Sequence, residues 1–325
     1  MNQDVVINHQ TQRIIAFGSN HDLIQLANAV EVAIDGTFDV CPAPFAQLVT
    51  LNSFIGPSVN RRLLLPRIYF LLPGKSLEVY RIVLQMTLEL MERAVGRAGA
   101  LRWRIIMCDF EAAIMAAFSD PNFDPAGILL IEACFFHACS TIYRKANETM
   151  SVEYNMPGSM LRRFTRKLYA LFYVPPQYVE ATFYDLLDTE VPPGFAADPR
   201  FVAFIHYFRI NWVENINNRN RGNVFNREDR RTINDLEGWH NSLNQVIRSH
   251  PNFWTFVERL QVVHYASQRK EAAALANPAQ TIRLRSRSIR IKEDNLRNLK
   301  AMYVRGDYPS NKAYVLAVAN YIYMR

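Results

Sequence analysis

The sequence lacks the features that mark secreted and membrane proteins. Its four cysteines form neither a Cys-x-x-Cys pair nor a regular framework, which favours a reducing intracellular compartment over secretion. No apolar run approaches the ~18 residues of a membrane-spanning helix, and the start, MNQDVVINHQ, has no charged-then-apolar signal region. Internal repeats and low-complexity tracts are also absent. We therefore expect a soluble intracellular protein with no membrane partner.

The composition is that of a folded globular protein. Half of the 325 residues are hydrophobic and 12% are aromatic, so the chain can bury a full core, as one domain with a large insertion or as two domains. The 37 basic residues outnumber the 30 acidic ones, for a net charge of +7. This excess favours a polyanionic partner without requiring one.

The first half of the chain alternates between strand and helix patterns. Helical spacing predicts one helix from Ser76, as its N-cap, to about Arg97, and another from Cys134 onward. β-type patterns predict strands at 31–38, 46–55, 64–72, 102–109 and 129–133. This order of elements indicates an α/β fold with a mixed sheet and flanking helices.

The second half of the chain is predicted to be helical. Residues 149–225 show helical segments broken by proline-rich turns and no β alternation, which predicts an all-helical insertion. A long helix is expected to begin near Asn234 and to pause at His250-Pro251. The α/β core is therefore completed only after the helical insertion, by this late helix.

Two acids close predicted strands. Asp35 ends the first strand and Asp109 ends the fourth, so both side chains meet at one edge if those strands are neighbours in the sheet. Glu237, on the late helix, is a third acid that can join them. Three carboxylates are hard oxygen ligands, and they suit Mg²⁺ or Mn²⁺.

Each acid also has a purely structural interpretation. Asp35-Gly36 is a common turn dipeptide. Asp109 can cap the helix that follows it, by accepting from free backbone N–H groups. Asn234 and Glu237 match a capping box, in which the glutamate satisfies the start of its own helix.

Four motifs, in this order, resemble the catalytic core of Mutator-like element (MULE) transposases. They are DGTF at 35–38, CDFEAA at 108–113, CFFH at 134–137 and RRTINDLEGWHNSLN at 230–244. The resemblance covers roughly residues 10 to 275 and includes the helical insertion before the last acid. It implies a ribonuclease H-like fold and assigns Asp35, Asp109 and Glu237 to the DDE metal site of that family.

The resemblance also implies an activity and a partner. DNA strands would be cleaved and joined by two-metal phosphoryl transfer, in which the metal ions lower the pKa of the nucleophile and stabilise the leaving oxygen. A nuclear location is expected, and a homodimer is expected by analogy because two DNA ends must be joined. The corresponding segments are 1–148 and 226–276 for the core, 149–225 for the insertion and 277–325 for a basic C-terminal part.

Two histidines accompany the acids. His137 follows Cys134 in the family's Cys-x-x-His motif, which implies a contact with the scissile phosphate, whereas residues of this type can also bind zinc. A buried thiol at a strand-to-helix junction is the simpler interpretation of Cys134. His240 lies one helical turn beyond Glu237, so it can orient that carboxylate or contact DNA.

Basic residues supply candidate DNA contacts in two segments. The loop before Glu237 and the alternating segment TIRLRSRSIRIK at 281–292 are both rich in arginine, which suits a phosphate backbone. The alternatives are a solvated loop for the first and a short, charge-protected strand or a nuclear-import patch for the second. The candidate arginines are Arg219, Arg221, Arg227, Arg230, Arg231, Arg283, Arg285 and Arg287.

Two tryptophans near these segments are interpreted as core residues. Trp239 belongs to an apolar stripe at helical spacing, so packing explains it best. Trp212 can stack on a flipped base, but a single tryptophan between apolar neighbours is usually buried.

The sequence departs from the MULE pattern in two places. It has no ligand set for the cysteine-and-histidine zinc module that recognises element ends, and the usual Arg-Thr-Asn-Asn before the last acid is Arg231-Thr232-Ile233-Asn234. Besides a DDE transposase, two functions stay open. One is a transposase-derived, non-catalytic DNA-binding or chromatin-associated protein, and the other is an unrelated metal-dependent phosphohydrolase.

Overall fold

The computed structural model describes residues 2–7, 10–58, 61–96, 102–124, 126–227, 234–282 and 284–322. Side chains are described from residue 12 onward, except those of Asn234, Asp235 and Glu237. The chain divides into two compact units, Met1–Glu132 with Ile233–Leu284 and Ala133–Thr232 with Arg285–Arg325. The segments expected from the sequence have other boundaries, at 148/149 and 225/226. They also treat the C-terminal part as a separate segment.

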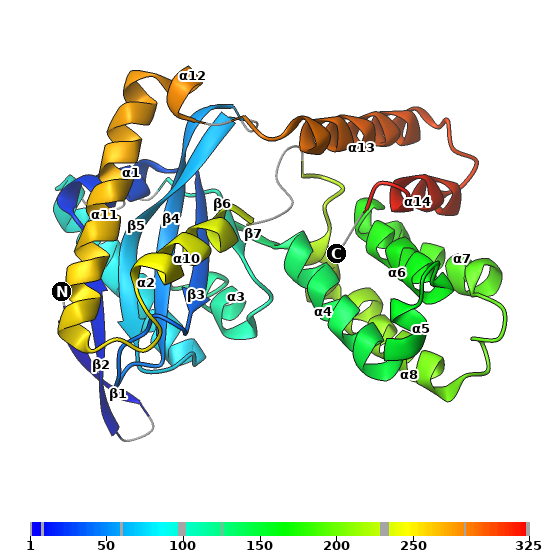
Figure 1. Ribbon diagram of the computed structural model, residues 1–325, viewed down its shortest axis with the longest axis horizontal. Coiled ribbons are helices and arrows are strands. Elements are labelled where there is room, and N and C mark those ends of the chain that lie inside the picture. Colours follow the sequence, from blue (N-terminus) through cyan, green and yellow to red (C-terminus); the bar gives the residue numbers. More distant parts are fainter. Residues whose placement is uncertain are drawn as a thin grey trace. The chain divides into compact units, whose positions relative to one another are not determined.

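The first unit is built on a seven-stranded mixed sheet (Figure 1). The strand order is β1-β2-β5-β4-β3-β6-β7. β3 pairs parallel with β6 and antiparallel with β4, and the pairings of β4 with β5, β5 with β2 and β2 with β1 are also antiparallel. The strands are β1 (Asn2–Ile7), β2 (Gln10–Phe17), β3 (Glu31–Thr37), β4 (Gln47–Ser58), β5 (Arg61–Leu72), β6 (Ile105–Cys108) and β7 (Leu130–Ala133).

All five predicted strands are confirmed, with β3, β4 and β5 as an antiparallel meander. The prediction missed the N-terminal hairpin of β1 and β2, which adds to the sheet beside β5. The polar run NHQTQR interrupts the apolar pattern of this hairpin, so the sequence gives only a weak strand signal there.

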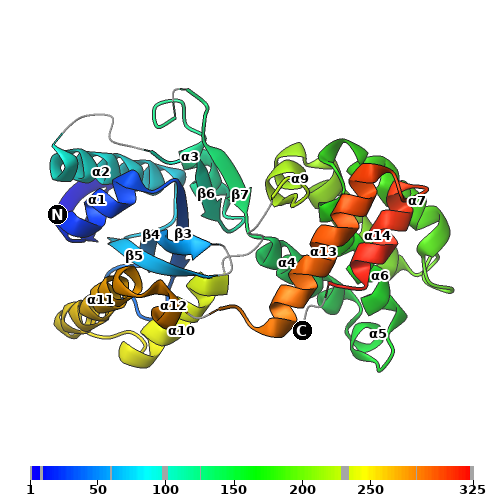
Figure 2. The same ribbon diagram turned by 90° about the horizontal axis from the view of Figure 1, so that it is seen from above.

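Helices cover both faces of the sheet. Figure 2 shows α1, α2 and α3 on one side of the strands and α10, α11 and α12 on the other. The predicted N-cap of α2 is confirmed, because the Ser76 hydroxyl accepts from the backbone N–H of Val79 at 3.3 Å. The bounds are α1 (Asn20–Asn28), α2 (Leu77–Val95), α3 (Ala112–Phe118), α10 (Asn234–Val246), α11 (Phe253–Ala276) and α12 (Pro278–Thr281).

In its described residues, the second unit is helical apart from the end of β7. The predicted all-helical insertion is confirmed, and its core is aromatic, with Phe183 stacked on Phe208 at a ring-centroid distance of 5.6 Å. Trp212 is 4% exposed and belongs to this core, as expected. The helices are α4 (Phe135–Thr149), α5 (Ser151–Asn155), α6 (Met160–Ala170), α7 (Val179–Glu190), α8 (Pro199–Phe208), α9 (Ile216–Gly222), α13 (Arg287–Arg305) and α14 (Asn311–Ala319). None of the helices in the described part of the chain combines the length and apolar character needed to cross a membrane.

The strand suggested for residues 281–292 is wrong. The structure forms α13 from Arg287 onward, with Ser286 as its N-cap and Gly306 in the left-handed conformation at its end. The alternation of basic and apolar residues extends over a few residues only, and the helical run SIRIKEDNLRNLKAMYVR with its two caps outweighs it. Arg285 precedes α13 in a coil, and Arg283 lies outside the described residues.

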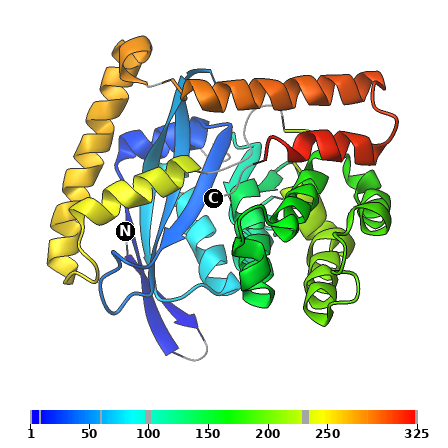
Figure 3. The ribbon, with the colours of Figure 1, turned by 45° about the vertical axis from the view of Figure 1, so that its right-hand side comes forward.

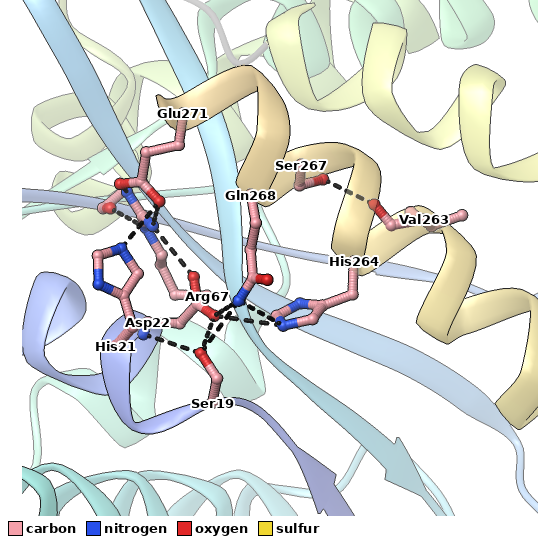
Figure 4. Close-up of polar contacts among 10 residues, drawn as sticks. Ser19, His21, Asp22, Arg67, Val263, His264, Ser267, Gln268 and Glu271 are labelled. Atoms are coloured by element: carbon pink, nitrogen blue, oxygen red, sulfur yellow. Dashed lines mark hydrogen bonds and ion pairs between the residues drawn. The ribbon is translucent and has the colours of Figure 1, made fainter. Parts of the chain in front are cut away.

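A buried ion network joins α1, β5 and α11 (Figure 4). The Arg67 side chain is 1% exposed and donates to Glu271 at 2.7 and 2.8 Å and to Asp22 at 3.1 Å. His21 lies 3.1 Å from Glu271, and His264 lies 3.4 Å from Asp22. Because a buried guanidinium needs compensating charge, these contacts fix α11 against β5.

We predict that Glu271→Ala destabilises the first unit by about 3–5 kcal/mol, because it leaves Arg67 buried without its bidentate partner. Glu258→Ala is the matched control, since Glu258 is an exposed glutamate on the same helix and should change stability by less than ~0.5 kcal/mol. Urea unfolding followed by circular dichroism measures both. Equal stability of the two variants would contradict a structural role for the network.

Candidate active site

The parallel pairing of β3 with β6 aligns the first two predicted acids. Glu31 pairs with Ile105, Val32 with Ile106 and Ala33 with Met107. β6 ends at Cys108, and extending this register by two residues brings Asp35 to the level of Asp109, which directly follows β6. Neighbouring strands are about 4.8 Å apart, so carboxylates at one level can share a cation.

The structure contradicts the turn interpretation of Asp35 and confirms part of the capping interpretation of Asp109, whose carboxylate accepts from a backbone N–H at the start of α3. Asp35 lies within β3, where it pairs with Thr50, so Asp35-Gly36 is not a turn. Asp109 is not the N-cap of α3, because that position belongs to Glu111, which makes no side-chain cap bond. One oxygen of Asp109 instead accepts from the backbone N–H of Glu111 at 2.9 Å.

Helix α10 covers the sheet face onto which Asp35 projects. Residues paired across neighbouring strands point to the same face, and Asp35, Thr50 and Tyr69 form one such row. Trp239 of α10 packs on Tyr69 with a ring-centroid distance of 6.1 Å, which confirms its core role. The next residue, His240, places Nδ1 3.5 Å from Oδ2 of Asp35.

Glu237 belongs to the same helix as His240. The two residues are three positions apart in α10, so they lie on the same side of the helix. The side chain of Glu237 is outside the described residues. Among the side chains that are described, no group of three or more histidines, cysteines, aspartates or glutamates lies close enough to hold a metal ion. The third ligand is therefore still a prediction.

A further carboxylate, Glu111, lies beside Asp109 and was not predicted as a site residue. Burial raises its pKa above the ordinary value, and the charge of Asp109 adds to that effect, while a hydrogen bond from Tyr80 and the charge of Lys75 oppose it. The Tyr80 hydroxyl also accepts from the Gln47 side chain at 2.9 Å. The sequence signal that could have identified Glu111 is its position two residues after Asp109, within the motif CDFEAA.

His137 and Cys134 belong to the second unit. His137 lies in the first turn of α4, and Cys134 is the buried N-cap residue of that helix, as expected for a thiol at a strand-to-helix junction. All four cysteines are buried, and none of them forms a disulfide. His137 and the acids of the first unit therefore come from separate compact units.

The arginines before α10 make backbone contacts where they are described. Arg219 donates to the carbonyl of Val213 at 3.0 Å. Arg227 is 8% exposed and donates to the carbonyls of Ala133 and Arg221. Arg230 and Arg231 lie outside the described residues. These contacts give Arg219 and Arg227 a structural role that the sequence did not predict.

No protein-family model matches the chain, and no curated protein matches it. The site consists of Asp35 within β3, Asp109 directly after β6, a histidine beside Asp35 and a glutamate with a raised pKa beside Asp109.

We expect Glu111→Gln to stabilise the protein at pH 7, because it removes a partly buried charge beside Asp109. An acid whose pKa is raised on folding contributes stability below its unfolded pKa, near 4.3, and that contribution is lost as the pH rises through the folded value. The advantage of the variant should therefore vanish towards pH 4. Thermal unfolding at both pH values tests this, with the exposed Glu78→Gln as control. A variant that is less stable than the wild type at pH 7 would refute this prediction.

Proposed function

We propose that the first unit is a ribonuclease H-like core that cleaves and joins DNA strands with Mg²⁺ or Mn²⁺, in the manner of a DDE transposase. The support for this fold is an antiparallel meander followed by a strand, β6, that is parallel to the first strand of the meander. The observation that carries the function is the common level of Asp35 and Asp109 on β3 and β6.

In this proposal the side chains supply ligands and orientation. Asp35, Asp109 and, from α10, Glu237 would be the ligands of the divalent cation. When bound, the cation would lower the pKa of a water or 3′-hydroxyl and stabilise the leaving oxygen. Nδ1 of His240 lies 3.5 Å from Oδ2 of Asp35 and positions this carboxylate. The other oxygen, Oδ1, accepts from the backbone N–H of Gly36 at 2.9 Å, and the two contacts together orient the carboxylate. The homodimer and the nuclear location stay predictions.

A second candidate is a transposase-derived protein that binds DNA without cutting it. One observation favours it, namely the proximity of His240 to Asp35. If the imidazole carried a proton at that position, it would supply the charge compensation that a metal ion would otherwise provide. The nicking assay below distinguishes the two candidates.

Nicking of a supercoiled plasmid in Mg²⁺ or Mn²⁺ tests the proposal. Asp35→Asn and Asp109→Asn should each lower the nicking rate by at least ~100-fold, because each removes a metal ligand. Asp39→Asn is the matched control, since Asp39 is an exposed aspartate four residues after Asp35 and should cut at the wild-type rate. Equal nicking by all four proteins would remove the aligned acids from the mechanism. Binding of DNA without nicking by the wild type would favour the second candidate.

A further inference from the structure

The net positive charge of the chain comes from the second of its two units. The second unit has 22 lysines and arginines against 13 aspartates and glutamates, a net charge of +9. The first unit has 15 against 17, a net charge of −2, and the two values give the +7 of the whole chain. The unit that contains the aligned acids therefore cannot attract a polyanion by its net charge.

Helix α13 is the most exposed long element of the second unit. It has 19 residues, of which only Leu296 is buried. Figure 3 shows it running alongside α14, against which it packs. Six of its residues are basic and two are acidic. A long, basic helix with so little buried surface has most of its side chains available to a partner.

Four arginines of α13 form one stripe. At about 100° per residue, Arg287, Arg290, Arg297 and Arg305 fall within roughly 80° of the helix surface and span about 27 Å of its length. Leu296 is about 180° from Arg287 on the same helix, so the stripe points away from the buried side. We call these four residues the arginine stripe.

The ion pairs of the arginine stripe leave it free to bind anions. Arg297 contacts Asp294 at 2.8 Å, and Arg305 contacts Asp307 at 2.8 Å. The four side chains in these pairs are 39–66% exposed, and such surface pairs contribute little to stability. Phosphates, which arginine binds through two parallel hydrogen bonds, can replace the carboxylates at small cost.

We infer that the arginine stripe is a binding surface for the phosphate backbone of DNA, independent of base sequence. The choice of DNA as the polyanion rests on the proposed function. An anionic membrane is the less suitable partner, because helices that lie on membranes present one continuous apolar face. The exposed apolar residues of α13, Ile289, Ile291, Met302 and Val304, are instead spread around the helix.

The test compares two triple variants with equal charge change in the full-length protein. Arg287→Gln/Arg297→Gln/Arg305→Gln neutralises the stripe, and Arg93→Gln/Arg259→Gln/Arg269→Gln neutralises three exposed arginines of the first unit. Fluorescence anisotropy with a labelled duplex of roughly 30 base pairs, in EDTA and over a range of salt, gives the affinity and its salt dependence. Circular dichroism melts verify that both variants are folded.

The stripe variant should reduce the slope of log K against log salt by about 2–3, since each lost phosphate contact accounts for ~0.9. The first-unit variant should bind within about twofold of the wild type at ~0.1 M salt, where distant charges are screened. An equal loss in both variants would overturn the proposal, and so would unchanged binding by the stripe variant. Loss of binding to phosphatidylserine vesicles, with DNA binding intact, would also overturn it.

This outcome is separable from that of the nicking assay. Asp109→Asn should bind the duplex like the wild type in EDTA, because Asp109 is not part of the stripe. A protein that never nicks DNA but loses DNA affinity in the stripe variant would support this inference while contradicting the catalytic proposal.

Discussion

The candidate site depends on one pairing, that of β3 with β6. Because the two strands are parallel, both leave the sheet at the same edge, and their register brings Asp35 and Asp109 to one level. A shift of one residue in this register would turn Asp109 toward the opposite face of the sheet. Ile106, Met107 and Cys108 are fully buried, so burial of β6 resists that shift.

The site also requires a helix, α10, that covers the sheet face onto which Asp35 projects. α10 lies on the sheet through Trp239, which packs on Tyr69, and α11 follows it after His250, a residue with a φ of 47°. The ion network of Arg67 then holds α11 from the opposite end. The network and the aromatic contact together fix where α10 can lie, and hence where His240 meets Asp35 of β3.

Local patterns in the sequence predicted much of this arrangement. The apolar runs before Asp35 and Asp109 singled out both acids, and helical spacing predicted α10, whose His240 lies beside Asp35. Long-range relations were not predictable. Nothing near Arg227 in the sequence shows that its guanidinium reaches the carbonyl of Ala133, and the raised pKa of Glu111 arises from burial that only the fold creates. The strand suggested by the alternation at 281–292 was also wrong. The alternation is short, and the two caps of α13 favour a helix.

The central claim is that Asp35 and Asp109 share one divalent cation, and calorimetric titration with Mn²⁺ tests it most directly. The account predicts that the wild type takes up the ion and that Asp35→Asn and Asp109→Asn each abolish this uptake, because neither carboxylate holds the cation alone. Uptake that is unchanged in either folded variant, or a folded wild type that binds no Mn²⁺ with or without DNA, would contradict it.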